Sequence, residues 1–156
     1  MKKILFIFLI FSILFSCQRK KSEIKIATIN QEKWPANESL DFKFRTETEN
    51  FQTDFLYQVQ MNPEFAWENI WLKYCLQGPK GDTLICSTDN LFLFEPKTGK
   101  PYGQGCRERL FLDAYFLKNV ILKDTGIYKI SIRHYLRTDT LQGIQSIGIR
   151  MKESGN

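Results

Sequence analysis

The chain has 156 residues and a formal net charge of +5, and 14% of its residues are aromatic. This aromatic content excludes a disordered or low-complexity chain, and the length fits one domain that can bury a core without the help of a metal. Without Lys2 and Lys3, which belong to a predicted signal peptide, the net charge falls to +3. Three more basic residues occupy positions 19–21, before the folded part. The domain itself is then nearly neutral and shows no clustered basic face, so we expect no nucleic-acid partner.

The first 16 residues have the pattern of a bacterial signal peptide. Two lysines follow Met1, and residues 4–15 are apolar except for Ser12. This run is shorter than the ~20 apolar residues that a membrane-spanning helix needs, and a small residue, Ser16, precedes Cys17. The stretch "LFSC" resembles the lipobox of bacterial lipoproteins, in which the chain is cut before a cysteine that becomes lipidated. The alternative is an ordinary signal peptide that happens to precede a cysteine.

Cys17 would then be the mature N-terminus and the site of lipidation. Its thiol would accept a diacylglycerol, and the amine that cleavage exposes would take a further fatty-acyl chain such as palmitate. Two or more acyl chains anchor a protein stably in a membrane, whereas one chain does so only marginally. Residues 18–23, "QRKKSE", follow as a polar, basic tether. We therefore expect a signal peptide over residues 1–16, a lipidated cysteine and tether over 17–23, and one folded domain over 24–156.

The first half of that domain alternates apolar and polar residues with a period of two. The pattern is clear in residues 39–46, "SLDFKFRT", and in residues 55–61, "FLYQVQM". Such alternation predicts half-buried strands. Residues 69–76, "NIWLKYCL", meet the turn residues "GPKGD" and continue at residues 83–87, "TLICS". This arrangement predicts a β-hairpin.

The second half opens with a predicted exposed loop over residues 95–105, "EPKTGKPYGQG". Residues 108–120, "ERLFLDAYFLKNV", fit either a pair of strands or one amphipathic helix. Residues 127–137, "IYKISIRHYLR", and residues 144–151, "IQSIGIRM", again alternate as strands do. About eight strands with frequent turns predict an all-β fold, an antiparallel β-sandwich of the jelly-roll or immunoglobulin-like kind.

Three cysteines remain after Cys17, and two of them flank the predicted hairpin turn. Cys75 and Cys86 lie symmetrically about "GPKGD", so a disulfide between them is one interpretation in an oxidising compartment. The other is that these two and Cys106 are small, partly buried apolar residues. The spacing lacks a C-x-x-C pair and His134 is the only histidine, so we expect no zinc site.

The sequence offers little that could catalyse a reaction. His134 is in phase with the apolar face of its predicted strand, where a packed or hydrogen-bonded histidine is more common than a catalyst. A serine elbow, a phosphate-binding loop and a dinucleotide-binding glycine pattern are missing, and no pair of carboxylates suggests glycoside hydrolysis. We therefore expect no enzyme, no metal and no cofactor. A small envelope hydrolase that uses His134 is one alternative interpretation of the chain's function.

Three tryptophans allow a second reading, a lipid-anchored carbohydrate-binding module. Trp34, Trp67 and Trp71 could form a platform on which sugar rings stack. Because Trp67 and Trp71 are four residues apart, a strand would direct both to the same face, which could equally be the core. Large aromatic side chains usually fill the interior, so burial is the stronger expectation.

The order of motifs along the whole chain resembles the GldH family of gliding-motility lipoproteins. The resemblance is carried by "LFSC", by Trp34–Pro35 followed by "LDFKF", by "NIWL" with "GPKGDTL", and by the C-terminal "GIYKISIRHYLRTDTLQGIQSIGIRMKE". It implies a non-enzymatic envelope component that gliding requires and that works with other gliding and secretion proteins of the envelope. The family has no catalytic residues to carry over, and only the lipidated cysteine transfers, onto Cys17.

The residues after Cys17 suggest where the lipoprotein is sorted. Position 18 is Gln rather than Asp, which by analogy with other lipoproteins favours the outer membrane. Positions 19–21 are basic, so the acidic signals that send some lipoproteins to the cell surface are missing. We therefore expect a protein anchored in the outer membrane on its periplasmic face.

Overall fold

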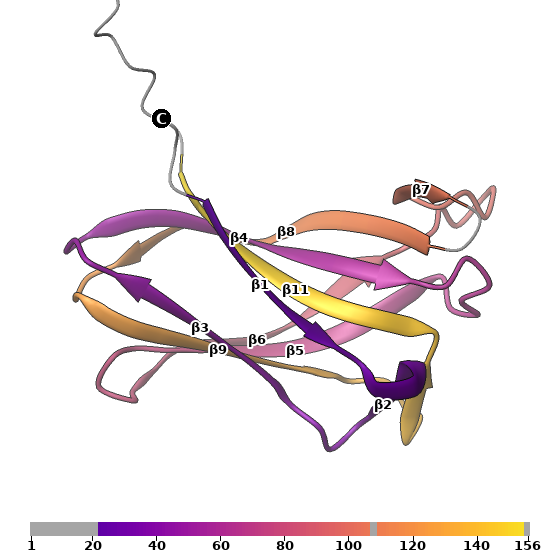
Figure 1. The fold of residues 1–156 in the computed structure, drawn as a ribbon, viewed down its shortest axis with the longest axis horizontal. Coiled ribbons are helices and arrows are strands. Elements are labelled where there is room, and N and C mark those ends of the chain that lie inside the picture. The colour runs from indigo at the N-terminus through magenta and orange to yellow at the C-terminus, as the bar shows by residue number, and fades with distance from the viewer. Residues whose placement is uncertain (1–21, 107–108, 155–156) are drawn as a thin grey trace, which may run out of the picture.

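The computed structural model describes residues 22–106 and 109–154, and these residues form an all-β sandwich of two antiparallel sheets (Figure 1). The five-stranded sheet has the order β1-β11-β4-β8-β7, and the four-stranded sheet has the order β3-β9-β5-β6. The predicted all-β antiparallel sandwich is therefore confirmed. The predicted signal peptide and Cys17 lie outside the described residues.

The strand bounds of the five-stranded sheet are β1 Ser22–Thr28, β4 Phe51–Met61, β7 Gln104–Cys106, β8 Arg109–Leu122 and β11 Ile144–Glu153. Those of the four-stranded sheet are β3 Leu40–Thr46, β5 Asn69–Gln77, β6 Thr83–Phe92 and β9 Gly126–His134. A short ribbon pairs β2, Lys33–Pro35, with β10, Thr140–Gln142, and a single 3-10 turn covers Asn30–Glu32. The sandwich thus begins at Ser22, within the segment that the sequence assigned to the tether.

The topology is that of a jelly roll. Eight strands form the two main sheets when the three shortest strands are set aside. Their order is β1-β11-β4-β8 in one sheet and β3-β9-β5-β6 in the other. This is the eight-stranded, double Greek-key arrangement that defines the jelly roll. It decides between the two sandwich types that the sequence allowed. The additional strands β2, β7 and β10 have three residues each.

The core lies between the sheets and follows from the alternation in the sequence. In β3 every second residue is buried, from Leu40 to Thr46, and the intervening residues are exposed. The same alternation in β9 buries Tyr128, Ile130 and Ile132. The facing residues come from β4 and β11, where Phe55, Tyr57, Val59, Met61, Ile147, Ile149 and Met151 are buried. Burial of this much apolar surface is the main force that holds the two sheets together.

Residues 109–122 form one long strand, β8, rather than a helix or a strand pair. The pairing of β4 with β8 shifts register twice, between Thr53 and Phe55 and between Phe55 and Leu56. Asn119, near the end of β8, has a φ of 55°, and its N–H donates to the Asp54 carboxylate over 2.8 Å. These irregularities interrupt the alternation of buried and exposed residues in the second half of β8.

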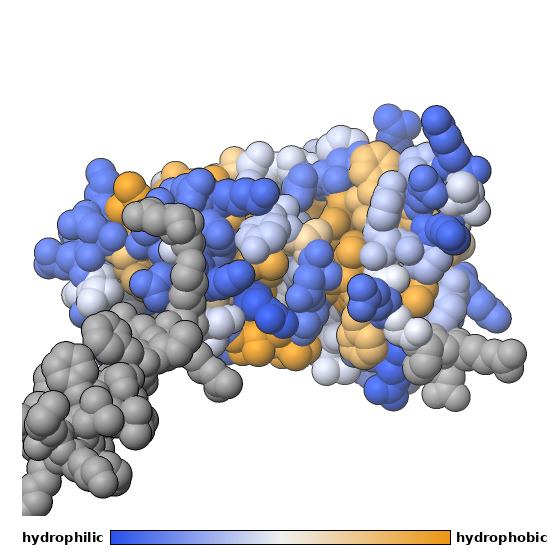
Figure 2. Space-filling model, turned by 90° about the horizontal axis from the view of Figure 1, so that it is seen from above, coloured by the Kyte–Doolittle hydropathy of each residue, from blue (hydrophilic) through white to orange (hydrophobic). Residues whose placement is uncertain are grey.

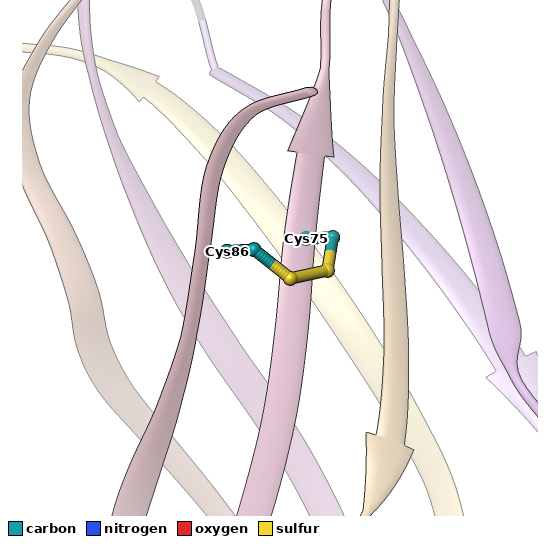
Figure 3. Close-up of a disulfide and its surroundings, with 2 residues drawn as sticks. All are labelled: Cys75 and Cys86. Carbon is teal, nitrogen blue, oxygen red and sulfur yellow. A yellow bond between two sulfur atoms is a disulfide. The ribbon is translucent and has the colours of Figure 1, made fainter. Parts of the chain in front are cut away.

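The hairpin of β5 and β6 is confirmed, and a disulfide joins its strands. Cys75 and Cys86 lie directly opposite each other with their Cα atoms 4.1 Å apart, and the bridge lies on the outer side of the four-stranded sheet (Figure 3). The side chain of Cys106 falls outside the described part of the chain.

Candidate functional site: an aromatic hollow at one end of the four-stranded sheet

A hollow of about 640 Å³ lies among exposed aromatic side chains at one end of the four-stranded sheet. Trp67 is 47% exposed, Trp71 is 43% exposed and Tyr135 is 61% exposed. Polar groups from Asn69, Thr88, Arg137 and Thr138 complete the lining, together with Leu136. We call this feature the aromatic hollow.

Strand alternation explains why Trp71 faces outward. Its neighbours in β5, Ile70 and Leu72, are fully buried, so the residue between them must point to solvent. Tyr135 comes directly after β9, and its N–H donates to the Trp71 carbonyl over 2.7 Å. This hydrogen bond fixes the two aromatic residues on adjacent strands.

Trp67 lies in the loop before β5, and two neighbours hold that loop in place. Phe65 is buried beneath it, and its N–H donates to the Asn62 carbonyl over 3.0 Å. The Glu68 carbonyl accepts hydrogen bonds from the N–H groups of Leu93 and Phe94, at 2.9 and 3.1 Å. The loop is therefore tied on both sides of Trp67, while the Trp67 side chain itself is exposed.

Trp34 is not part of this site. It is fully buried, its indole N–H donates to the Glu38 carbonyl over 3.1 Å, and its ring meets His134 edge-on at 5.4 Å. The prediction that Trp34 belongs to a sugar-binding platform is therefore wrong. The expectation of burial is wrong for Trp67 and Trp71, which are exposed.

His134 is a core residue in the structure. It is 1% exposed, and its Nε2 lies 3.0 Å from the Trp34 carbonyl oxygen. Since a carbonyl only accepts, Nε2 carries the proton and Nδ1 is left without a hydrogen-bond partner among the described residues. Burial lowers the pKa of His134, which keeps the ring neutral.

Burial also shifts the pKa of the half-buried Asp89 and of the buried Tyr57. Burial raises the pKa of Asp89, an effect that a hydrogen bond from the Asn90 N–H partly offsets. Burial also raises the pKa of Tyr57, whose hydroxyl has no partner among the described residues. Within residues 22–106 and 109–154, no group of His, Cys, Asp or Glu side chains is placed to hold a metal ion.

The hollow lies at the end of the sandwich opposite to Ser22. Ser22 pairs with Lys152, which pairs with Asp54 near the start of β4. The strand β8 ends beside the start of β4, and β9 begins just after it, at Gly126. Tyr135 follows the other end of β9. Figure 1 shows the same polarity, because β1 starts beside the end of β11 and runs toward β2. In the described part of the chain, no helix is long and apolar enough to span a membrane.

The fold and this surface define a jelly-roll domain with an aromatic hollow that is suited to binding. The sequence model of the GldH lipoprotein family matches residues 23–151. The chain therefore belongs to the GldH lipoprotein family, a non-catalytic family of gliding-motility lipoproteins. No curated protein matches the chain.

Several solved structures contain a similar arrangement of strands. They include the VP2 subviral particle of infectious bursal disease virus, at 12% identity and a TM-score of 0.43, and a CocE/NonD family hydrolase from Staphylococcus aureus, at 10% and 0.46. A serine protease of Aeromonas sobria matches at 11% and 0.33. These matches cover 90%, 87% and 94% of this chain but 34%, 34% and 29% of those chains. The chain thus spans about a third of their length, and at these scores they carry no functional argument.

Proposed function

We propose that the protein is a lipid-anchored, non-enzymatic structural or assembly component of the gliding machinery. It would be held in the outer membrane by acyl chains on Cys17, face the periplasm, and contact other gliding and secretion proteins of the envelope. The observation that carries this proposal is the match of the GldH lipoprotein family model to residues 23–151. The arrangement of the domain agrees with an anchored role. Ser22, where the chain leaves toward Cys17, and the aromatic hollow lie at opposite ends of one sandwich. A domain anchored at one end presents the hollow away from the membrane.

Colony spreading of a gene-deletion strain tests this proposal. Wild-type protein should restore spreading, whereas Cys17→Ala should fail because the domain is no longer held at the membrane. Trp71→Ala should also fail if the hollow contacts a partner. Tyr115→Ala is the matched control, because it removes an exposed aromatic ring from the other sheet. Normal spreading of the deletion strain would contradict a role in gliding.

Carbohydrate binding is the second candidate function, and the exposure of Trp67 and Trp71 favours it. Aromatic rings that flank a hollow with Asn and Thr side chains can stack against sugar rings and hydrogen-bond to their hydroxyls. Co-sedimentation of the full-length protein with an insoluble polysaccharide measures this directly. Binding should be lost in Trp71→Ala and kept in Tyr115→Ala. Equal binding by both variants would show that the hollow takes no part.

A further inference from the structure

The outer face of the four-stranded sheet carries a concentration of basic side chains that the sequence analysis did not foresee. Six cations share this side of the domain: Lys43, Arg45, Lys73, Lys129, Arg133 and Arg137, which we call the basic face. The strands β3, β9 and β5 are neighbours in the sheet but distant in the sequence. The premise that the domain has no clustered basic face is therefore wrong, because pairing of these strands assembles one.

The register of the strands places like charges directly opposite each other. Lys73 pairs with Arg133, and Lys43 pairs with Lys129. Directly opposed side chains in an antiparallel sheet lie ~5 Å apart at their Cβ atoms, where like charges destabilise the sheet. Nothing in the packing of the core requires a cation at these outward positions. Charges that oppose folding, at positions where any polar residue would fit, point to a role in binding an anion.

These cations are also largely free of protein partners. Of the ion pairs among the described residues, the one that involves the basic face joins Lys129 to Asp41, at 3.7 Å. The opposite face of the domain, seen in Figure 2, mixes hydrophilic and hydrophobic residues. There Arg150 lies 3.5 Å from Asp113. An anionic ligand is therefore better matched to the basic face.

The basic face runs directly into the aromatic hollow. In β5 the outward residue next to Lys73 is Trp71. Tyr135, which directly follows β9, is the next outward residue after Arg133, and its N–H donates to the Trp71 carbonyl. A row of two opposed cations thus adjoins a row of two aromatic rings. From Lys129 to Tyr135 the surface extends over six residue-to-residue steps, about 20 Å of extended chain. Such a length fits a polymer of several units better than a single small molecule.

We propose that the basic face and the aromatic hollow together bind a linear polysaccharide that carries carboxylate groups. Sugar rings stack on Trp71 and Tyr135, and carboxylates lie against Lys73 and Arg133. The proposal rests on the sugar-binding candidate and adds the charge of the ligand. A lipid surface fits less well, because the hollow lies at the end of the domain away from Ser22. Nucleic acid would also meet cations and aromatic rings, but the Cys75–Cys86 disulfide in the middle of this face places it in an exported, oxidising environment.

Affinity electrophoresis of the full-length protein in detergent, through gels that contain polygalacturonate, tests the proposal. Wild type should be retarded, and the retardation should weaken as salt is added. The double variant Lys73→Gln, Arg133→Gln should bind about tenfold more weakly. The matched control is Lys118→Gln, Lys123→Gln, which loses the same charge at exposed positions near the Ser22 end and should bind as wild type does. Fully methyl-esterified polygalacturonate should retard the wild type much less.

Several results would overturn the proposal. Wild type could pass through polygalacturonate unretarded, the Lys73, Arg133 variant could bind as well as wild type, or both double variants could lose the same affinity. The methyl-esterified polymer could also retard the protein in a way that depends on Trp71 but not on Lys73 and Arg133. The hollow would then bind neutral sugars, and the proposed role of the ligand's carboxylates would be refuted. Stronger retardation by single-stranded DNA than by polygalacturonate would replace the polysaccharide with a nucleic acid. Removing opposed like charges should not impair folding, so loss of binding is not explained by an unfolded variant. None of these readings depends on motility, so they are separate from the colony-spreading test.

Discussion

Acidification should destabilise the protein through His134 well before the pH reaches the range of its carboxylates. The ring is 1% exposed, its Nε2–H is used by the Trp34 carbonyl, and its Nδ1 has no partner among the described residues. A second proton on Nδ1 would bury a positive charge and an unpaired donor together, which is costly. Burial accordingly lowers the pKa of His134 in the folded protein.

The sign and the size of the effect follow from proton linkage. In the unfolded chain His134 regains a pKa near 6.5, so below that pH the unfolded state binds a proton that the folded state does not. The stabilising contribution is complete above pH 6.5 and is lost as the pH falls, until the lowered folded-state pKa is reached. The slope is at most about 1.4 kcal/mol per pH unit. Between pH 6.5 and 5.0 the free energy of unfolding should fall by up to about 2 kcal/mol, a large share of a typical 5–15 kcal/mol.

Urea unfolding at pH 7.5, 6.0 and 5.0 measures this loss, with His134→Gln as the comparison. A glutamine amide can still donate to the Trp34 carbonyl, but it does not titrate. The free energy of unfolding should therefore fall more steeply for wild type than for the variant. Asp54, whose pKa is lowered by hydrogen bonds from Asn119 and Ser154, titrates at lower pH and cancels in the difference. A difference between the two proteins that does not change with pH would refute the reasoning.

Three further substitutions test the fold and the basic face by urea unfolding. Phe44→Ala, which empties a fully buried core position, should lower the free energy of unfolding by about 3–5 kcal/mol; a loss below 1 kcal/mol would contradict its place in the core. Gly143→Ala should cost about 1–3 kcal/mol, because φ is +89° there and a Cβ would lie 3.0 Å from the Phe65 ring; an unchanged stability would contradict this conformation. Lys73→Glu should raise stability by about 0.5 kcal/mol by facing Arg133 with an opposite charge, yet weaken polygalacturonate binding; lower stability would contradict the register.

The strands could be predicted where the signal is local. In β3 and β9 the alternation of apolar and polar residues states directly which side chains are buried, and the structure follows it. In β8 burial alternates only as far as Phe116, because two register shifts and the left-handed Asn119 interrupt the pleat in the second half of the strand. A bulge depends on the neighbouring strand, which a single segment of sequence does not reveal.

The aromatic hollow was partly within reach of the sequence. Trp71 is in phase with Lys73 in β5, and a lysine rarely points into a core. That phase predicts an outward tryptophan more strongly than the general burial of aromatic residues argues against it. Trp67 gives no such signal, because it lies in a loop where period-two reasoning does not apply. The basic face was out of reach, since it depends on which residues of β3, β5 and β9 oppose one another.

The C-terminal stretch that carries part of the resemblance is explained by folding rather than by binding. In "LQGIQSIGIR", Gly143 occupies a left-handed position that glycine tolerates best. Gly148 is closely enclosed, because a Cβ would lie 3.1 Å from Ile26 and 3.2 Å from the Lys25 carbonyl oxygen. The isoleucines of this stretch are buried, and its arginine pairs with Asp113 across the sheet.

This stretch therefore stabilises the sandwich, and contact with a ligand is left to side chains that point outward. Outward positions such as Trp71, Lys73 and Arg133 alternate with core positions in the same strands. Substitutions there change the surface without disturbing the core, because successive side chains of a strand lie on opposite faces. A chain could keep the fold while the chemistry of this face changes. Family membership alone cannot fix the ligand, and substitutions confined to outward positions are the ones that can identify it.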